Sequence, residues 1–428
     1  MDTSHQKTSE NNWTMVEVKE GSVTFLVPRR SEHLPEQYQS GLPAISSQLV
    51  RKEPRKNEPV FYNPKQAFNR DLSILILRAW AKIFLPIESI IELFCGSGIR
   101  SLRYLIEGPP FDRLVCNDLN EDAISLTKKN LERIREKKVT SIEYSVNEAR
   151  LRLSKAFLQN EYFTVIDVDP FGSPQPFLFD AIRVLHNPGL LMVTATDMPV
   201  WVGIYPEKAY KRYGIPDFRI KGRSYIHEVA LRSFIAYVQR VGLSLNRILI
   251  PLISLSADHY MRVAFIVKKG ENKQILDQSG YIVECLDCNT RWTINLSKYQ
   301  KKKNSPCICG KNNLSQVGPV WLGALHSDEF LTTLVEEYDK NGHDITDRRN
   351  RIGVFLNRMI QENKFSYPWY FDLHWLAKGH FSALGTEEAI QILKNMNVEA
   401  VPTHFSGKGI KTYLQASELR EIFKNYSK

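Results

Sequence analysis

The sequence has no long apolar run and few cysteines, and each absence excludes a class of protein. The longest apolar run, ILIPLISLSA from Ile248, is interrupted by Pro251 and is too short to cross a bilayer. The first residues, MDTSHQKTSENNW, are polar and show no secretory signal. Six cysteines in 428 residues, four of them clustered, suit a metal site in a reducing compartment better than a disulfide framework. We therefore expect a cytoplasmic protein without a membrane segment.

The charge balance and the length of the chain indicate its partners and its domains. Lys and Arg exceed Asp and Glu by 57 to 47, which gives a net charge of +10. This surplus favours a polyanionic partner, nucleic acid before membrane. A chain of 428 residues is longer than one hydrophobic core usually accommodates, so we expect two domains. The charged, polar stretch at 268–280 predicts a boundary between a first domain of residues 1–270 and a smaller second domain of residues 271–428. No obligate protein partner is inferred.

Between residues 70 and 195, short β-branched runs alternate with helical patterns, as in a parallel sheet covered by helices. The expected strands are 89–94, 113–118, 142–146, 163–169 and 190–196. Residues 246–256 and 260–269 predict an antiparallel pair, and residues 16–29 predict an N-terminal hairpin. The pattern favours an α/β, Rossmann-like fold.

The first expected strand ends in ELFCGSG, a loop that suits a nucleoside. Gly96 and Gly98 allow the backbone to approach a ligand closely, and the Glu92 carboxylate can accept from a charged amino group. Asp118 closes the next strand, 20 residues after Gly98, where an acid can accept from both ribose hydroxyls. The third glycine of the dinucleotide fingerprint is replaced by Ser101. This departure disfavours a dehydrogenase and favours a reader of S-adenosylmethionine.

The fourth expected strand leads into DVDPFGSP at residues 167–174. In open α/β sheets ligands bind beyond the carboxyl ends of the strands, so this segment faces the same crevice as the glycine loop. The Asp169 carboxylate and the Pro170 carbonyl can accept from the exocyclic amine of a nucleobase, and Phe171 offers a stacking face. The alternative is an ordinary strand-to-turn transition, because Asp, Pro and Gly are turn formers.

Four segments give the chain a resemblance to a known family. They are FYNPKQAFNRDLS (61–73), GSGIRSLR (96–103), DVDPFGSP (167–174) and THFSGKGIKT (403–412). Through them the chain resembles the tRNA (guanine-26-N2)-dimethyltransferases, S-adenosylmethionine-dependent enzymes of archaea and eukaryotes. The resemblance implies a class I methyltransferase fold for the first domain, tRNA and S-adenosylmethionine as partners, and dimethylation of the N2 amine of guanine 26 as the reaction.

The resemblance also implies roles for individual residues. It adds Arg70, Arg100 and Phe61 to the candidates named above, and it assigns the loop Glu148-Ala149 to the methyl donor. From the residues alone, two interpretations of Glu148 are equally good, a contact to the adenine of the donor and a solvent-exposed acid in a loop. The expected catalytic residues are Asp169, Phe171 and Phe61. The expected donor-binding residues are Arg70, Glu92, Gly96, Gly98, Arg100, Asp118, Glu148 and Ala149.

The clustered cysteines form two close pairs. Cys285 and Cys288 make a C-x-x-C, and Cys307 and Cys309 make a C-x-C after 18 intervening residues. Four thiolates suit a closed, structural zinc site in a small mixed α/β domain that docks tRNA. The competing interpretation is free or redox-active thiols. Between the pairs, KYQKKK (298–303) is either an RNA-backbone contact or a solvated loop.

Two other functions stay open at this point. An adenine-N6-type amino-methyltransferase acting on RNA or DNA carries an Asp-Pro-Pro-aromatic motif similar to DPFG, but this chain lacks the second proline and has FYNP and NRD. A non-catalytic nucleotide-sensing RNA-binding protein is the other alternative. The intact Asp169, Asp118 and Gly96 weigh against it, because a degenerate enzyme tends to lose such residues.

Overall fold

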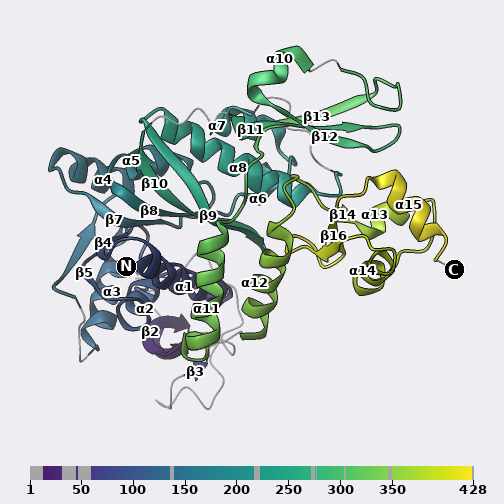
Figure 1. The fold of residues 1–428 in the computed structure, drawn as a ribbon. Coiled ribbons are helices and arrows are strands. Elements are labelled where there is room, and N and C mark those ends of the chain that lie inside the picture. The colour runs from purple at the N-terminus through teal and green to yellow at the C-terminus, as the bar shows by residue number, and fades with distance from the viewer. Residues whose placement is uncertain are drawn as a thin grey trace, which may run out of the picture.

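The protein is described from a computed structural model that covers most of the chain. The described residues are 13–30, 45–46, 59–134, 139–215, 222–270, 275, 277–302, 305–345 and 349–426. A large α/β body occupies one side of the molecule, and smaller β-rich and helical units from the C-terminal third lie on the other side (Figure 1). Within these residues, no helix is both long enough and apolar enough to serve as a bilayer-spanning segment.

A seven-stranded sheet with the order β6-β5-β4-β7-β8-β10-β9 forms the centre of the α/β body. The first five strands pair in parallel, and β10 is antiparallel to both of its neighbours. The strands are β4 Ile87–Glu92, β5 Phe111–Asp118, β6 Ser141–Val146, β7 Phe163–Val168, β8 Leu185–Ala195, β9 Arg247–Ala257 and β10 Tyr260–Lys269. Every residue of β7 is buried, as expected for a central strand covered on both faces. The predicted strands and the antiparallel pair are confirmed, with shifted ends.

Helices cover both faces of this sheet. One face carries α1 Ala67–Ile83, α2 Ile99–Glu107 and α3 Glu121–Glu132, and the other carries α4 Ala149–Leu158, α5 Gln175–Arg183 and α8 Ile226–Leu243. Two short helices, α6 Met198–Trp201 and α7 Pro206–Tyr213, follow β8. The arrangement is an open, doubly wound sheet, so the loops after its parallel strands meet at one edge.

The N-terminal hairpin is confirmed. Strands β1 Trp13–Glu20 and β2 Val23–Arg30 pair antiparallel, and β2 packs against α2 and α3. The turn between them needs Gly21, whose φ of 58° is left-handed and whose added Cβ would lie 2.3 Å from Glu107 Oε1. A short third strand, β3 Ile45–Ser46, pairs in parallel with β1.

The C-terminal third has two small sheets and a helical pair. One sheet has β11 Ser279–Cys285, β12 Arg291–Asn295 and β13 Leu314–Trp321, with α10 Tyr299–Lys302 in one connection. The pair is α11 Asp328–Ile345 and α12 Arg349–Asn363. The last unit has β14 Phe371–Asp372, α13 Leu373–Ala377, α14 Thr386–Asn395, β15 Ala400–Pro402, β16 Gly409–Thr412 and α15 Ala416–Lys424.

The described part of the C-terminal third packs directly against the α/β body. Helix α11 packs against α1, and β13 packs against α8. Apolar side chains from both parts share one buried core, with Trp201 and Phe234 on one side and Ile282 and Trp321 on the other. The boundary after residue 270 stays a prediction, since the described core is continuous across it.

A buried ion network joins the sheet to its helices. Asp167 on β7 accepts from Arg262 Nη1 at 3.1 Å and Nη2 at 2.9 Å, and it also accepts from the Tyr104 hydroxyl. Arg100 Nη1 lies 3.3 Å from the same carboxylate. Burial would raise the pKa of Asp167, but Arg262 and Arg100 hold it below its ordinary value. Asp167 therefore belongs to the framework beneath the site.

Removing the cation opposite Asp167 should destabilise the whole fold. Arg262→Met should lower the free energy of unfolding by about 3–5 kcal/mol, because it leaves a buried carboxylate without its main partner. Arg133→Met is the matched control, since Arg133 pairs with Glu17 at the surface. The control should cost less than about 1 kcal/mol. Equal losses in urea denaturation of the two variants would contradict the role given to Arg262.

Candidate active site

A cavity of about 790 Å³ opens at the carboxyl edge of the parallel strands. Its walls come from the loops after β4, β5, β7 and β8, the start of α1, the β9–β10 turn and α12. Eight of the residues expected from the sequence line it: Phe61, Arg70, Glu92, Gly96, Arg100, Asp118, Asp169 and Phe171. Segments separated by more than 100 residues in the chain thus meet at the place that a doubly wound sheet offers for a ligand.

The glycine loop and Asp118 are joined directly. Gly96 has a φ of 52°, and its backbone N–H donates to Asp118 Oδ2 at 2.9 Å. The second oxygen, Oδ1, accepts from the backbone N–H of Asn120 at 3.0 Å. A carboxylate has about four acceptor sites, so two remain for other donors. Asp118 therefore holds the loop and keeps acceptor capacity toward the cavity.

Three of the expected donor-binding residues do not line this cavity. Gly98 is the N-cap of α2, and an added Cβ there would lie 2.8 Å from Thr127 on α3, so this glycine allows close helix packing. Glu148 caps α4 by accepting from the backbone N–H of Leu151 at 3.1 Å, and Ala149 is buried. Their roles in donor binding stay predictions.

Asp169 is oriented by Arg100. Arg100 Nη2 donates to Asp169 Oδ2, while Nη1 donates to Asn69 Oδ1 at 3.1 Å and to Ser73 Oγ at 2.9 Å. Burial works to lower the pKa of Arg100, but Asp167 and Asp169 raise it well above its ordinary value, so the guanidinium stays charged. Among the described residues, Asp169 Oδ1 contacts no donor, and the side chain is one-fifth exposed. One oxygen is fixed by Arg100, and the residue lines the cavity.

Two aromatic rings form the mouth of the cavity beside Asp169. Phe171 is 74% exposed and meets Phe61 edge to face, with ring centroids 4.5 Å apart. The loop that carries Phe171 is tied down, since the Gly172 N–H donates to Thr196 Oγ1 at 2.6 Å and Ser173 Oγ hydrogen-bonds the Tyr213 hydroxyl at 2.6 Å. A large apolar ring held in water at the edge of a rigid loop offers a stacking surface to a planar ligand.

The sequence did not reveal the partner of Arg70. Its guanidinium makes two hydrogen bonds of 2.6 Å to the Glu20 carboxylate at the end of β1, and it donates to Asn63 O at 3.0 Å. Burial would raise the pKa of Glu20, but Arg70 and Arg103 lower it to about 2. Arg70 therefore anchors the N-terminal hairpin at the cavity wall. No local pattern marks Glu20, since the pairing depends on tertiary folding.

Some buried polar atoms around the glycine loop have no hydrogen-bond partner among the described residues, so a ligand could supply one. Ser97 Oγ and Gln66 Oε1 are buried at the cavity wall and have no hydrogen-bond partner in the described structure. Glu92 is also buried there, and burial raises its pKa to about 8 although Arg100 opposes the shift. These groups fit an organic cation with amino and hydroxyl groups, such as the expected methyl donor.

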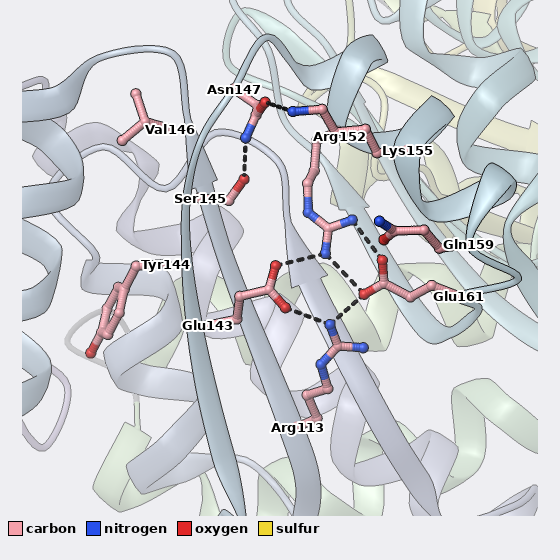
Figure 2. A pocket seen from close by; sticks show the side chains of 10 residues that line it. All are labelled: Arg113, Glu143, Tyr144, Ser145, Val146, Asn147, Arg152, Lys155, Gln159 and Glu161. Atoms are coloured by element: carbon pink, nitrogen blue, oxygen red, sulfur yellow. Dashed lines mark hydrogen bonds and ion pairs between the residues drawn. The ribbon is translucent and has the colours of Figure 1, made fainter.

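A second cavity, of about 500 Å³, lies at the β6 edge of the sheet (Figure 2). Its two carboxylates are already paired, because Arg113 and Arg152 each bridge Glu143 and Glu161, and Lys155 Nζ donates to Asn147 Oδ1 at 2.7 Å. None of the expected catalytic or donor-binding residues lines it. The carboxylates of this cavity are therefore already engaged by arginines of the protein, and we assign no ligand to it.

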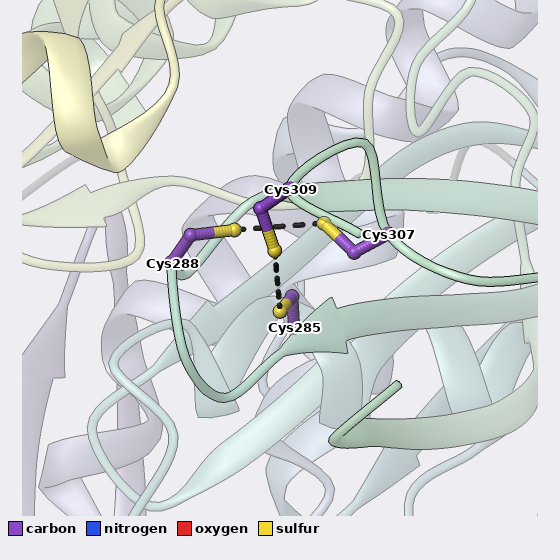
Figure 3. Close-up of side chains that lie close together, drawn as sticks. All are labelled: Cys285, Cys288, Cys307 and Cys309. Carbon is purple, nitrogen blue, oxygen red and sulfur yellow. Dashed lines mark hydrogen bonds between the residues drawn. The ribbon is translucent and has the colours of Figure 1, made fainter. Parts of the chain in front are cut away.

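The four clustered cysteines converge at the end of β11 (Figure 3). The sulfur atoms of Cys285 and Cys309 lie 3.8 Å apart, and those of Cys288 and Cys307 lie 3.5 Å apart. A zinc ion bound at about 2.3 Å by four sulfurs sets them about 3.8 Å from one another. The sulfur positions fit a tetrahedral zinc site that leaves no position open for a substrate.

His326, Glu362 and His404 form a second buried group of metal-type side chains. His326 Nδ1 accepts from the Ser254 backbone N–H at 3.2 Å, and burial lowers the pKa of the imidazole to about 3. A neutral ring that accepts at Nδ1 carries its proton on Nε2, so Nε2 is a donor rather than a metal ligand. His404 hydrogen-bonds Glu362. This group is a buried polar core between α11, α12 and the last sheet.

Comparison with known proteins agrees with this geometry. The family model described as N2,N2-dimethylguanosine tRNA methyltransferase matches residues 42–424. The tRNA (guanine(26)-N(2))-dimethyltransferase of Pyrobaculum islandicum is 32% identical, over 94% of this chain and 97% of its own length. The enzyme of the same name from Pyrobaculum arsenaticum is 32% identical, over 86% of this chain and 91% of its own.

A solved structure gives the same result for the fold. Trm1 from Pyrococcus horikoshii, determined in complex with S-adenosyl-L-methionine, aligns with a TM-score of 0.76 and 25% sequence identity over 95% of this chain and 99% of that chain. The predicted class I methyltransferase fold is thereby confirmed. The chain belongs to the N2,N2-dimethylguanosine tRNA methyltransferase family.

Proposed function

We infer that the protein dimethylates the exocyclic N2 amine of guanine 26 in tRNA, with S-adenosylmethionine as methyl donor. The observation that carries this inference is that one cavity brings the DPFG residues Asp169 and Phe171 together with the glycine loop and Asp118. Family membership disfavours an adenine amino-methyltransferase and a non-catalytic RNA-binding protein. We assign the methyltransferase domain to residues 1–270 and the tRNA-docking domain to residues 271–428.

The target amine is proposed to bind at Asp169. Its lone pair is delocalised into the guanine ring, so the amine is a weak nucleophile. Asp169 Oδ1 and the Pro170 carbonyl accept the two N–H groups, which localises the lone pair and directs it at the methyl group. Phe61 and Phe171 hold the extruded base by stacking. As the N–C bond forms, the S–C bond of the donor breaks and leaves a neutral thioether. Asp169 takes the proton that leaves the amine, and Arg100 steadies the carboxylate.

The methyl donor is proposed to bind over the glycine loop. Asp118 accepts from the ribose hydroxyls with the acceptor sites that Gly96 and Asn120 leave open. Glu92 receives the amino group of the methionine part, and the cavity wall contributed by Arg70 and Arg100 completes the site. The bound donor supplies a methyl group on a positively charged sulfur, which is reactive without a metal. Catalysis by the chain is mainly positioning.

The C-terminal domain is proposed to dock tRNA. Its four-cysteine cluster, the proposed zinc site, holds the connection between β12 and β13, in which Lys298 and Lys301 flank Tyr299. Tyr299 stacks on Tyr281 with ring centroids 3.9 Å apart, so part of the KYQKKK segment is packed against its own sheet. Lys303 and the side chain of Lys302 lie outside the described residues. The basic residues of this connection suit contacts to RNA phosphates.

The first test replaces the proposed acceptor of the amine proton. Asp169→Asn should lower turnover on unmodified tRNA by a factor of about 100 or more, the scale of a lost acid–base group. The affinity for the donor should stay within a factor of about two, because Asp169 is proposed to contact the guanine rather than the donor. Labelled donor and mass spectrometry of the nucleosides identify the product.

Asp180→Asn is the matched control, because Asp180 pairs with Arg183 on α5, outside the cavity. It should methylate guanine 26 at the normal rate. Normal turnover by Asp169→Asn would refute its assignment, and a product other than dimethylguanosine at position 26 would refute the proposed reaction.

A pH test addresses Glu92. Because its pKa is raised to about 8 in the free protein, the carboxyl is protonated at neutral pH. An ammonium group needs the carboxylate, so donor binding should release a proton, and affinity should rise with pH from about 6 to 7.5, below the pKa of the donor's own amino group. Calorimetry in two buffers of different ionisation enthalpy measures the released proton. Glu92→Gln should bind more weakly and release none, and a wild type that releases none would contradict the assignment.

Metal analysis tests the cysteine cluster. Protein purified without chelators should contain about one zinc per chain, since four thiolates complete a tetrahedral shell. Cys307→Ser should lose zinc, melt at lower temperature and bind tRNA more weakly, while Cys116→Ala, a cysteine of β5 outside the cluster, should keep its zinc. Absence of zinc, together with four thiols that react rapidly in the native protein, would support free thiols instead.

A further inference from the structure

The order of the strands gives the two ends of the active-site cavity different roles. From β5 to β10, the cavity is lined in turn by Asp118, the glycine loop, Asp169, Thr196 and the β9–β10 turn. If Asp118 binds the donor ribose, as proposed above, the methyl group points toward Asp169. The β9–β10 turn then lies on the far side of Asp169, where the target nucleotide enters.

Two segments meet at this far end. Asp258 and His259 form the β9–β10 turn and are exposed, and Arg351 on α12 reaches the same wall from the C-terminal third. Arg351 Nη2 donates to Asp258 Oδ1 at 2.7 Å, and its guanidinium lies 4.5 Å from the centre of the Phe68 ring. The Arg351 side chain is one-third exposed. A fixed cation therefore stands at the nucleotide end of the cavity.

We propose that Arg351, with His259 beside it, binds a phosphate of the RNA backbone next to the target guanosine. The proposal rests on the proposed function, because it needs a nucleotide at Asp169. An extruded base carries its backbone toward the pocket, so phosphate groups come to the rim. Arg351 suits them because a guanidinium has five N–H donors in a fork that matches phosphate, and the described contact with Asp258 uses one.

A purely structural latch explains the arrangement less well. Arg351 and Asp258 are 33% and 43% exposed in their side chains, and ion pairs this exposed contribute little to stability. The Phe68 ring lies 4.5 Å from the guanidinium and restrains it by a cation–π contact, which occupies none of its N–H donors. Asp258 and Phe68 thus orient the cation at small energetic gain, as a preformed binding group requires.

The test compares two arginines of one helix in the full-length protein. Arg351→Gln should raise KM for tRNA about 10-fold or more and reduce the salt slope of tRNA binding by about 0.7–0.9, the contribution of one phosphate contact. Arg358→Gln removes the same charge two helical turns along α12, at a residue that does not line the cavity, and should change neither quantity. Donor affinity should be normal in both variants.

Asp258→Asn separates phosphate binding from a latch. It breaks the same ion pair but keeps the cation, so the salt slope should stay at the wild-type value. Equal slopes for Arg351→Gln and Arg358→Gln, or equal loss of slope in Asp258→Asn and Arg351→Gln, would overturn the proposal. If Arg351→Gln unfolds, Arg351→Lys keeps the charge without the fork, and it should show the normal slope with a raised KM. A wild type that binds the donor but methylates no guanine in tRNA would instead overturn the proposed function.

Discussion

A buried carboxylate needs cations around it, and Asp167 imposes that requirement on the centre of this protein. It lies on the middle strand of the sheet, fully buried, and Arg262 and Arg100 reach it from β10 and α2. Arg100 also forms an ion pair with a second carboxylate at the edge of this network, that of Asp169. The framework and the active site therefore share one arginine. The two acids of DVD have different positions, since Asp167 holds the arginine inside the protein and Asp169 lines the cavity.

The sequence predicted the sheet well, because β-branched runs buried on both faces leave a strong pattern. It also predicted most of the cavity, because Gly96, Asp118 and Asp169 follow strands whose carboxyl ends meet at one edge. It did not predict Glu20 or Arg351, since an ion pair between distant segments has no local signature. Gly98 shows a further limit, because a glycine needed for close helix packing has the same appearance as one needed for a ligand.

The two parts of the chain both contribute to the site. The α/β body supplies the glycine loop and the DPFG loop, and α12 supplies Arg351 to the cavity wall. Packing of α11 on α1 and of β13 on α8 fixes the relation between these parts. A substrate that contacts the C-terminal third and extrudes a base at Phe171 would thus meet one continuous surface, which favours recognition of a folded RNA over a free nucleoside.

The buried carboxylate of Glu228 on α8 ties the end of the chain to its middle. It accepts from Arg232 one turn along the same helix, and from Lys411 on β16 at 2.8 Å, across 183 residues of sequence. A ribosome releases these residues in order, so α8 emerges long before its second cation is made. Until β16 is made, Arg232 is the one cation of the two that the Glu228 carboxylate can pair with. Final closure of the protein is therefore an event of the completed chain rather than of its first half.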